Sequence, residues 1–178
     1  MREVTLGSLV QRNIGYGIVQ PGESVLGGVP VVKVKDIISR LRSVRELDTT
    51  SREIDSKYAR SRLQGGELLI SVVGTPGRTC IVPIDFKGCN VARAVAIIDI
   101  ADKALSLWVK YFLDSPTAQN YIKSELNTTV QPTLNIKSLV NMTIPIPDHE
   151  TINRIVGLLS SIDAKIGINE RINDNLSA

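Results

Sequence analysis

The chain has 178 residues, enough for one globular domain and an appendage, and its apolar fraction of 43% can build a sizeable core. A net charge of +3 makes it mildly basic, which is compatible with a nucleic-acid partner but does not identify one. Two cysteines cannot form a disulfide scaffold, and one histidine argues against a histidine-based metal site or catalytic triad. With neither a signal-peptide stretch nor an apolar run of about 18 residues that could span a membrane, we expect a cytoplasmic protein.

Residues 1–147 are expected to form an α+β domain that is rich in strands. The segments alternate between β-branched runs, loops with glycine and proline, and amphipathic stretches. Pro116 can begin a helix, because proline suits the first helical turn. In chain order we predict a short helix or strand at 1–12, a loop at 12–23, a strand at 29–37, a polar irregular segment at 40–62 with a short helix near 56–63, a hairpin at 66–84, a strand at 90–100, one or two helices at 103–126, a polar loop at 128–135, and a helical turn followed by a strand at 136–147.

The segment from residue 148 onward predicts one long helix with an apolar seam. Pro147 ends the preceding strand, Asp148 is a good N-cap, and Glu150 lies in the first turn, where the helix dipole favours a negative charge. A helix that continued through Leu176 would be about 43 Å long, at roughly 1.5 Å per residue. The seam has the a/d spacing of a coiled coil and consists of Ile155, Leu159, Ile162, Ile166, Asn169, Asn173 and Leu176.

This seam is too long to be covered by a body of the size of residues 1–147, so we expect the helix to protrude and to pair with another helix, as in a homodimer. Asn169 and Asn173 have two readings. A buried polar residue in a coiled coil fixes register or partner number, whereas polar residues at a frayed helix end cost nothing. The sequence therefore divides into a body, residues 1–147, and a stalk, residues 148–178.

Basic residues are concentrated in the body. Residues 33–62 carry nine basic and five acidic side chains, a net charge of +4, whereas the segment from Asp148 onward has a net charge of −2. The basic run is either a solvated face or a surface that neutralises DNA phosphates, and arginine can also read guanine in the major groove. The candidate DNA contacts in this run are Lys33, Lys35, Arg40 and Arg42.

Three further features offer polar groups to DNA, and each also has a purely structural reading. The glycine-rich loop GTPGRT, residues 74–79, can hold phosphate through its backbone amides and Arg78, or it can be a plain hairpin turn. It lacks the Lys-Ser/Thr end of a Walker A loop. The carboxamides of Gln131 and Asn135 can pair with adenine edges or cap a loop, and Tyr16 can contact a sugar or close a small cluster.

One pattern imitates a nuclease. Pro147-Asp148 and Asp163-Ala164-Lys165 match the PD…(D/E)xK arrangement, in which two carboxylates and a lysine hold Mg²⁺. Asp163 and Lys165 are two residues apart on a predicted helix and therefore point to different faces. The sequence also lacks an Asn-Pro-Pro-aromatic methyltransferase motif and a glycine-rich cofactor motif. We therefore expect no catalytic centre, cofactor or metal.

Several pieces of the chain, in this order, resemble a known family. They are GYGIV, GVPVVKVKDI, GGELLISVVGTPGRTCIV, NVARAVAII, YFLDSPTAQNYI and TTVQPTLNIKSLVNMTIPIP, followed by a helix that begins with a proline and a glutamate. Their order is similar to that in the specificity (S) subunit of type I restriction–modification enzymes, in particular to one target recognition domain with its adjoining conserved-region helix. The family's helix commonly begins Glu-Gln, whereas Thr151 follows Glu150 here. That Gln is absent from this chain, so a contact that it makes in the family is not carried over.

The resemblance implies a non-catalytic role in DNA recognition. S subunits usually hold two target recognition domains separated by two long antiparallel helices. Each domain reads one half of a bipartite site in double-stranded DNA, and the helices set the spacing and dock the methyltransferase (M) subunits. With one domain and one helix, the chain resembles a half-subunit, and two copies are expected to pair their stalks antiparallel and read a symmetric site. Two other functions remain open: an assembly subunit that binds no DNA, and an enzyme.

Overall fold

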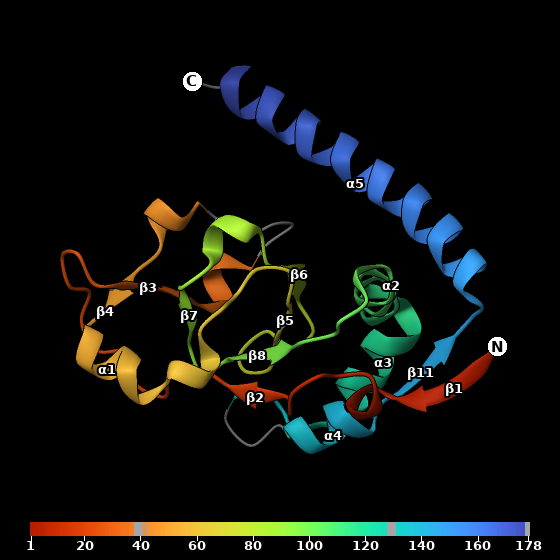
Figure 1. The fold of residues 1–178 in the computed structure, drawn as a ribbon, viewed down its shortest axis with the longest axis horizontal. Helices are drawn as coiled ribbons and strands as arrows, with labels where there is room; N and C mark the ends of the chain where they lie inside the picture. Colours follow the sequence, from red (N-terminus) through yellow and green to blue (C-terminus); the bar gives the residue numbers. More distant parts are fainter. Residues whose placement is uncertain (38–40, 42, 128–130, 177–178) are drawn as a thin grey trace.

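The computed structural model describes residues 1–37, 41, 43–127 and 131–176, and it has the α+β architecture that the sequence predicts. A four-stranded antiparallel sheet with strand order β2-β8-β5-β6 lies at the centre of the body. Most helices gather on one side of this sheet, whereas shorter strands and a short helix lie on the other (Figure 1). The strands of the central sheet are β2 (Gly15–Tyr16), β5 (Leu68–Ser71), β6 (Thr79–Ile81) and β8 (Val95–Ile98).

Strand β5 is buried on both faces and separates two core clusters. All four of its residues are buried, so a continuous apolar run replaces the alternation of a half-exposed strand. Because successive side chains of a strand point to opposite faces, Leu68 and Ile70 pack into the first cluster and Leu69 into the second. Strand β8 alternates in the same way, with Ala96 in the first cluster and Ile97 in the second. The central sheet is therefore shared by both cores.

The first core cluster lies among the helices. Each of three helices begins at a side-chain cap, supplied in turn by Asp102, Ser115 and Asn135. Pro116 stands in the first turn of the second helix, so the segment that the sequence left as one or two helices forms two. The elements of this side are α2 (Lys103–Asp114), α3 (Pro116–Ser124), α4 (Ile136–Asn141) and the antiparallel pair β1 (Arg2–Thr5) and β11 (Thr143–Ile146).

The second core cluster lies among short strands. Strand β3 (Val29–Val32) pairs antiparallel with β4 (Thr49–Thr50) and parallel with β7 (Asn90–Val91). Helix α1 (Arg52–Lys57) follows β4, and its N-cap Ser51 accepts a hydrogen bond from the backbone N–H of Ile54 at 3.2 Å. A separate pair is formed by β9 (Leu126–Asn127) and β10 (Thr133–Leu134).

Several elements differ from the sequence prediction, among them β2, which lies in the loop expected at 12–23, and β10, which lies in the loop expected at 128–135. The strand expected at 29–37 ends at Val32, where the Asp36 carboxylate accepts a hydrogen bond from the backbone of Lys33 and closes a 3-10 turn. The strand expected at 90–100 is two strands in different sheets, because a turn separates β7 from β8. The helix expected near 56–63 lies earlier, since Ser51 caps it and it ends before Tyr58.

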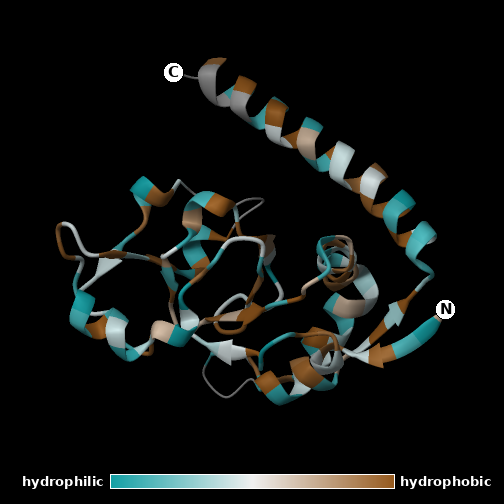
Figure 2. Cartoon of the chain, viewed as in Figure 1, coloured by the Kyte–Doolittle hydropathy of each residue, from teal (hydrophilic) through white to brown (hydrophobic). Residues whose placement is uncertain are grey.

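The C-terminal helix α5 (His149–Leu176) has the predicted length, and Asp148 caps it by accepting a hydrogen bond from the backbone of Thr151 at 2.8 Å. Ile152 and Val156 in its first two turns belong to the first core cluster. Farther along, α5 stands clear of the body in Figure 1, and apolar segments recur along it, brown in Figure 2. Even so, neither α5 nor another described helix is long and apolar enough to cross a membrane.

Candidate nucleic-acid interface and helical stalk

The two described lysines of the predicted DNA surface form ion pairs with the same carboxylate. Lys33 Nζ is 2.8 Å, and Lys35 Nζ 2.7 Å, from Asp48 Oδ2. Hydrogen bonds from Lys33 and then Lys35 lower the pKa of Asp48 to about 2, so this carboxylate is ionised at neutral pH and offsets one of the two positive charges. DNA would compete with Asp48 for these lysines. Arg40 and Arg42, predicted to act with them, lie outside the described residues.

The GTPGRT loop connects β5 to β6 in the predicted hairpin and forms a well-bonded turn. Gly74 and Gly77 have φ angles of +81° and +96°, in the region that favours glycine. The Ser71 hydroxyl spans the loop by accepting a hydrogen bond from the backbone N–H of Arg78 at 2.9 Å. The Arg78 side chain is exposed, and its Nη1 donates to the carbonyl of Ile37 at 3.4 Å. The loop thus presents an arginine to solvent from a fixed backbone.

Two of the predicted contact loops touch each other. The backbone N–H of Gly74 donates to the carbonyl of Pro132 at 3.0 Å, which places the GTPGRT loop against the segment that follows Gln131. Both Gln131 and Arg78 are exposed. The structure therefore brings together two loops whose bonded residues, Gly74 and Pro132, are 58 positions apart in the sequence, and one ligand could meet both loops.

The other two predicted contacts have different surroundings. Asn135 is the N-cap of α4, because its Oδ1 accepts a hydrogen bond from the backbone of Lys137 at 2.8 Å. Its side chain therefore has the capping role that the sequence left open. Tyr16 lies in β2, at the opposite edge of the central sheet from β6, and is 40% exposed.

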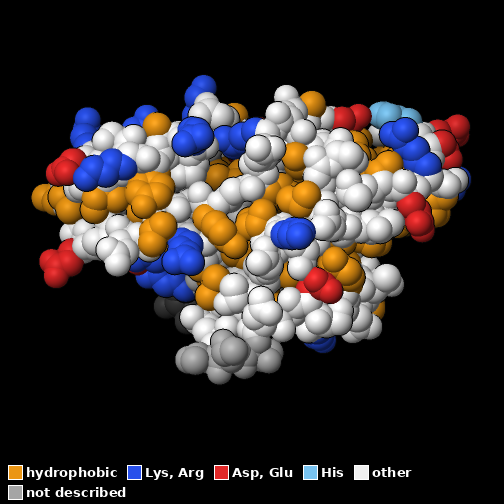
Figure 3. Space-filling view, turned by 90° about the horizontal axis from the view of Figure 1, so that it is seen from below, with side chains coloured by type: hydrophobic (Ala, Val, Ile, Leu, Met, Phe, Trp, Pro, Cys, Tyr) orange, Lys and Arg blue, Asp and Glu red, His pale blue; other side chains and the backbone are white. Residues whose placement is uncertain are grey.

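Tyr16 also lines a cleft that sequence reasoning missed. The cleft has a volume of about 710 Å³ and lies between β2 and residues 57–64. The face that carries α1, on the left of Figure 3, shows more Lys and Arg than acidic side chains. No local pattern signals this cleft, since it requires the pairing of β2 with β8. Among the described residues that line it, the charged ones are all basic: Arg12, Lys57, Arg60 and Arg62.

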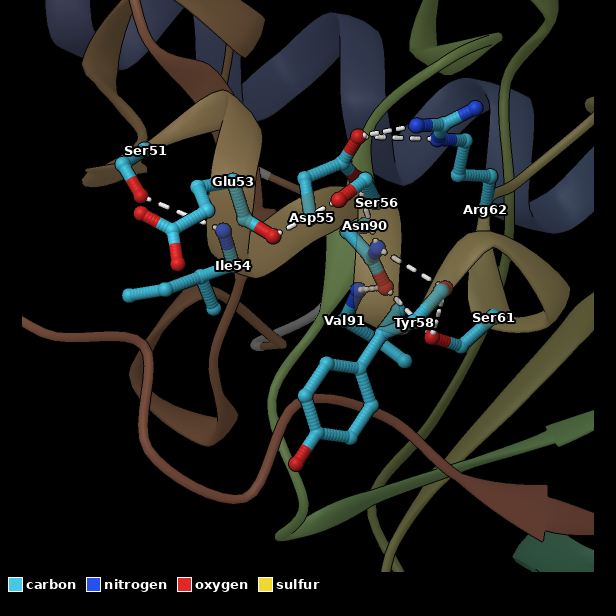
Figure 4. A network of polar contacts seen from close by, with 10 residues as sticks. All are labelled: Ser51, Glu53, Ile54, Asp55, Ser56, Tyr58, Ser61, Arg62, Asn90 and Val91. Atoms are coloured by element: carbon cyan, nitrogen blue, oxygen red, sulfur yellow. Dashed lines mark hydrogen bonds and ion pairs between the residues drawn. The ribbon is translucent and has the colours of Figure 1, made fainter.

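A buried polar network fixes the wall of the cleft formed by residues 57–62 (Figure 4). Asn90 is fully buried, and its Nδ2 donates to Asp55 Oδ1 at 2.8 Å while its Oδ1 accepts from Ser61 Oγ at 2.6 Å. Arg62 Nε donates to Asp55 Oδ2 at 2.9 Å. Burial alone would raise the pKa of Asp55, but the hydrogen bonds from Arg62 and Asn90 outweigh it and hold that pKa below its usual value. The wall is thus tied to β7 by an ionised, satisfied carboxylate.

The predicted seam of α5 has an anchored part and an exposed part. Ile155 and Leu159 are half-buried, because this part of α5 packs against α2. Ile162 and Ile166 are 45% and 48% exposed. The described residues that continue the exposed seam are Asn169, Asn173 and Leu176. The helix therefore leaves the body with an apolar stripe facing solvent.

The nuclease-like pattern is not brought together as a site. Asp163 links α5 to α2, because it accepts a hydrogen bond from Tyr111 Oη at 2.9 Å and lies 3.3 Å from Lys110 Nζ. Asp148 is the N-cap of α5, about 22 Å away along the helix at roughly 1.5 Å per residue. Within the described ranges, no group of three or more His, Cys, Asp and Glu side chains is arranged to hold a metal ion.

The two cysteines are structural. Cys80 and Cys89 are buried free thiols of the second core cluster. Burial raises the pKa of Cys80 to about 12 and that of Cys89 to about 11, so both stay protonated at neutral pH. A protonated, buried thiol is a poor nucleophile.

Comparisons with known proteins agree with this fold and with the order of the motifs. Residues 3–178 match the family described as the type I restriction modification DNA specificity domain. The chain is 32% identical over 182 residues to the type I restriction enzyme EcoBI specificity subunit of Escherichia coli, an alignment that covers 98% of the chain and 38% of that relative.

Solved structures share the fold. The S subunit of a type I restriction-modification system from M. genitalium is 14% identical, with a TM-score of 0.60, and the HsdS subunit from Thermoanaerobacter tengcongensis is 16% identical, with a TM-score of 0.63. Both alignments cover 98% of this chain, but 44% and 45% of those chains. The chain thus spans less than half the length of these relatives. Together with the fold, the match over residues 3–178 shows that the chain belongs to the specificity-subunit family of type I restriction–modification systems, as the order of its motifs predicts.

Proposed function

We propose that the chain is a DNA sequence-recognition subunit that directs methyltransferase and restriction subunits to a bipartite site, in the cytoplasm, and performs no chemistry itself. The observation that carries this proposal is the family match over nearly the whole chain. The basic segment of the body and the exposed arginine of the GTPGRT loop support a DNA partner, because phosphate contacts by Lys and Arg dominate affinity for DNA.

The DNA contacts predicted from the sequence form part of this proposal. Arg78 and Gln131 are the strongest pair, because their loops touch and both side chains are exposed. Lys33 and Lys35 would bind phosphate by giving up their ion pairs with Asp48. The remaining candidates are Arg40, Arg42, Asn135 and Tyr16. For Asn135 the amide nitrogen is the group that would meet a base, since its oxygen caps α4.

We also propose that residues 148–178 act as a stalk on the body formed by residues 1–147. Two chains would pair antiparallel through their stalks and so present two recognition domains to a symmetric site, and the paired stalks would dock the methyltransferase subunits. The length of the relatives, more than twice that of this chain, supports a pair of such units. Ile152 and Val156 anchor the stalk in the core, so it would hold the two bodies at a set spacing.

The exposed apolar stripe of α5 also fits a second function, that of an assembly subunit that oligomerises without binding DNA. Burial of such a stripe requires a protein partner but says nothing about nucleic acid. DNA binding that weakens with salt distinguishes the first function from the second.

The proposed function is tested by reconstitution with the methyltransferase subunit. The purified full chain is incubated with DNA, Mg²⁺ and S-adenosylmethionine, first alone and then with the methyltransferase subunit. We expect methylation only in the second mixture, and none by the methyltransferase subunit without the chain. Activity of the repurified chain alone that Asp163→Ala abolishes would overturn the non-catalytic role. A second mixture that methylates no DNA would overturn the recognition role.

A further inference from the structure

The cleft between β2 and residues 57–64 is a second candidate surface for DNA, apart from the two touching loops. Its volume of about 710 Å³ is lined by apolar, aromatic and basic side chains. Ile14 and Ile97 contribute apolar surface, and Tyr16 and Tyr58 contribute aromatic surface. A cleft of this composition suits a ligand that is apolar on one side and anionic on the other.

Two of the four basic residues of the cleft are bound within the protein. Arg12 Nε lies 3.0 Å from Asp99 Oδ2, and Arg12 Nη2 lies 3.3 Å from Glu67 Oε1. Arg62 pairs with the buried carboxylate of Asp55. These guanidinium groups neutralise buried or half-buried carboxylates. They therefore stabilise the structure of the cleft and are not its ligand-binding cations.

The other two basic residues are available to a ligand. Lys57 makes a surface ion pair with Glu53, four residues earlier on α1, and such exposed pairs are worth little in water. The exposed Arg60 side chain has no charged or hydrogen-bonding partner among the described residues. Its backbone is nevertheless fixed, because the Arg60 carbonyl accepts a hydrogen bond from Arg12 Nη1 at 3.0 Å. The wall of the cleft thus offers two cations from a held backbone.

The two tyrosines of the cleft, Tyr16 and Tyr58, are also available to a ligand. Tyr16 is 40% exposed, and neither its hydroxyl nor that of Tyr58 has a hydrogen-bond partner among the described residues. The Tyr58 ring points away from the polar network around Asn90 in Figure 4. An aromatic ring offers a flat apolar surface to a sugar, and a tyrosine hydroxyl is a common donor to phosphate oxygen.

We propose that this cleft seats a stretch of DNA backbone, with deoxyribose against Tyr16 and Tyr58 and the flanking phosphates on Lys57 and Arg60. This inference rests on the proposed function and adds a contact surface to it. Contacts to sugar and phosphate fix the register of a protein on a duplex without reading sequence directly. The cleft would therefore position the body, and the touching loops of Arg78 and Gln131 would remain free to read bases.

The test measures how salt affects binding to a duplex of random sequence, because a phosphate contact strengthens binding to every sequence. The full chain is assembled with its methyltransferase subunit, and that subunit alone supplies the baseline. Lys57→Ala/Arg60→Ala is expected to lower the slope of log affinity against log salt by close to two units, at about 0.9 per lost contact. Affinity at low salt is expected to fall by roughly tenfold or more.

The matched control is Lys103→Ala/Lys123→Ala, which removes the same charge from exposed positions of α2 and α3 outside the cleft. It should leave the slope unchanged, and both double variants should keep the wild-type melting temperature. Tyr16→Ala should weaken binding, because it removes the flat surface against the deoxyribose, whereas Tyr16→Phe should keep most of the affinity.

The outcomes separate this inference from the function beneath it. If the wild-type complex binds above baseline but the two double variants behave alike, the cleft is not a DNA site and the proposed function stands. If the wild-type complex binds this random duplex no better than the methyltransferase subunit alone, the cleft assignment is wrong, whereas the proposed function is decided by the methylation test.

Discussion

Asn90 determines whether the wall of the cleft stays in place. Its amide satisfies one carboxylate oxygen of Asp55 and accepts from Ser61, and all three side chains are buried. In a buried network of this kind, the loss of one member leaves its partners unsatisfied in a low-dielectric interior. The stability of residues 57–62 therefore depends on a residue that is distant in sequence and carries no charge.

Asn90→Ala is expected to destabilise the fold by about 3 kcal/mol, because it leaves a buried carboxylate oxygen of Asp55 without its hydrogen bond, whereas Ser61 Oγ keeps its bond to the Tyr58 carbonyl. The measurement is the free energy of unfolding by urea denaturation. Asn141→Ala, at an exposed position on α4, is the matched control and should change that free energy by less than about 0.5 kcal/mol. Equal effects of the two substitutions would show that the network contributes nothing special.

At the scale of single residues, sequence reasoning found the local interactions and missed the distant ones. The cap at Asp148 was predictable, because it joins residues three apart. The pairing of Lys33 with Asp48, 15 residues away, was not, and it changes how the basic segment is read. The bond between Tyr111 and Asp163 spans 52 residues and depends on how α5 packs on α2. No spacing rule reports such contacts.

Among the elements, α5 shows how one apolar pattern can hold two faces. The predicted seam includes Ile155 and Leu159, yet the α5 residues that are buried in the core are Ile152 and Val156, which are also four apart. The helix therefore carries one stripe toward the body in its first turns and another toward solvent farther along. Sequence alone identified a long apolar helix but could not assign which apolar residues meet the body.

Ile152→Ala is expected to lower the free energy of unfolding by about 2–4 kcal/mol, because Ile152 is 4% exposed and its loss leaves a cavity in the first core cluster. Leu158→Ala on the same helix removes a side chain that is 63% exposed and should cost less than about 0.5 kcal/mol. Both are measured by urea denaturation below the concentration at which the chain associates. A larger effect at Leu158 would contradict the assignment of the anchored face.

Elements with local signals were predicted best. The hairpin of β5 and β6 follows from a glycine-rich turn between two apolar runs, and Pro116 separates α2 from α3. The segment 90–100 was predicted as one strand, because nothing local shows that β7 leaves to pair in parallel with β3. A parallel partner strand is distant in the chain, so the residues of the segment itself do not indicate it.

At the scale of the whole molecule, the central sheet connects the candidate sites, because each of them includes residues at or beside its strands. Strands β5 and β8 contribute side chains to both core clusters, and the GTPGRT loop and β2 belong to the same sheet. The α+β class and the long helix were predictable from composition and periodicity. The cleft was not, because it arises only where residues 12–16 and 57–64 meet.

The charge distribution of the whole chain assigns the two proposed partners, DNA and protein, to different parts of the molecule. The basic segment belongs to the body, whereas the stalk has a net charge of −2 and an exposed apolar stripe. Apolar surface gains roughly 25 cal/mol per Å² on burial, so the stripe favours a protein partner over solvent. A second copy of the chain offers the same stripe, and an antiparallel pair would bury both.

We expect the wild-type chain to be a homodimer at tens of micromolar by light scattering, paired through the exposed part of α5. Ile162→Asp should yield a monomer, because it would place an unpaired carboxylate within the buried seam. Ser161→Asp adds the same charge at an exposed neighbouring position and should leave the dimer intact. Because neither residue belongs to the core clusters, both variants should keep the melting behaviour of the body. A wild-type chain that stays monomeric at these concentrations would exclude the homodimer and direct the stripe of α5 to a different subunit.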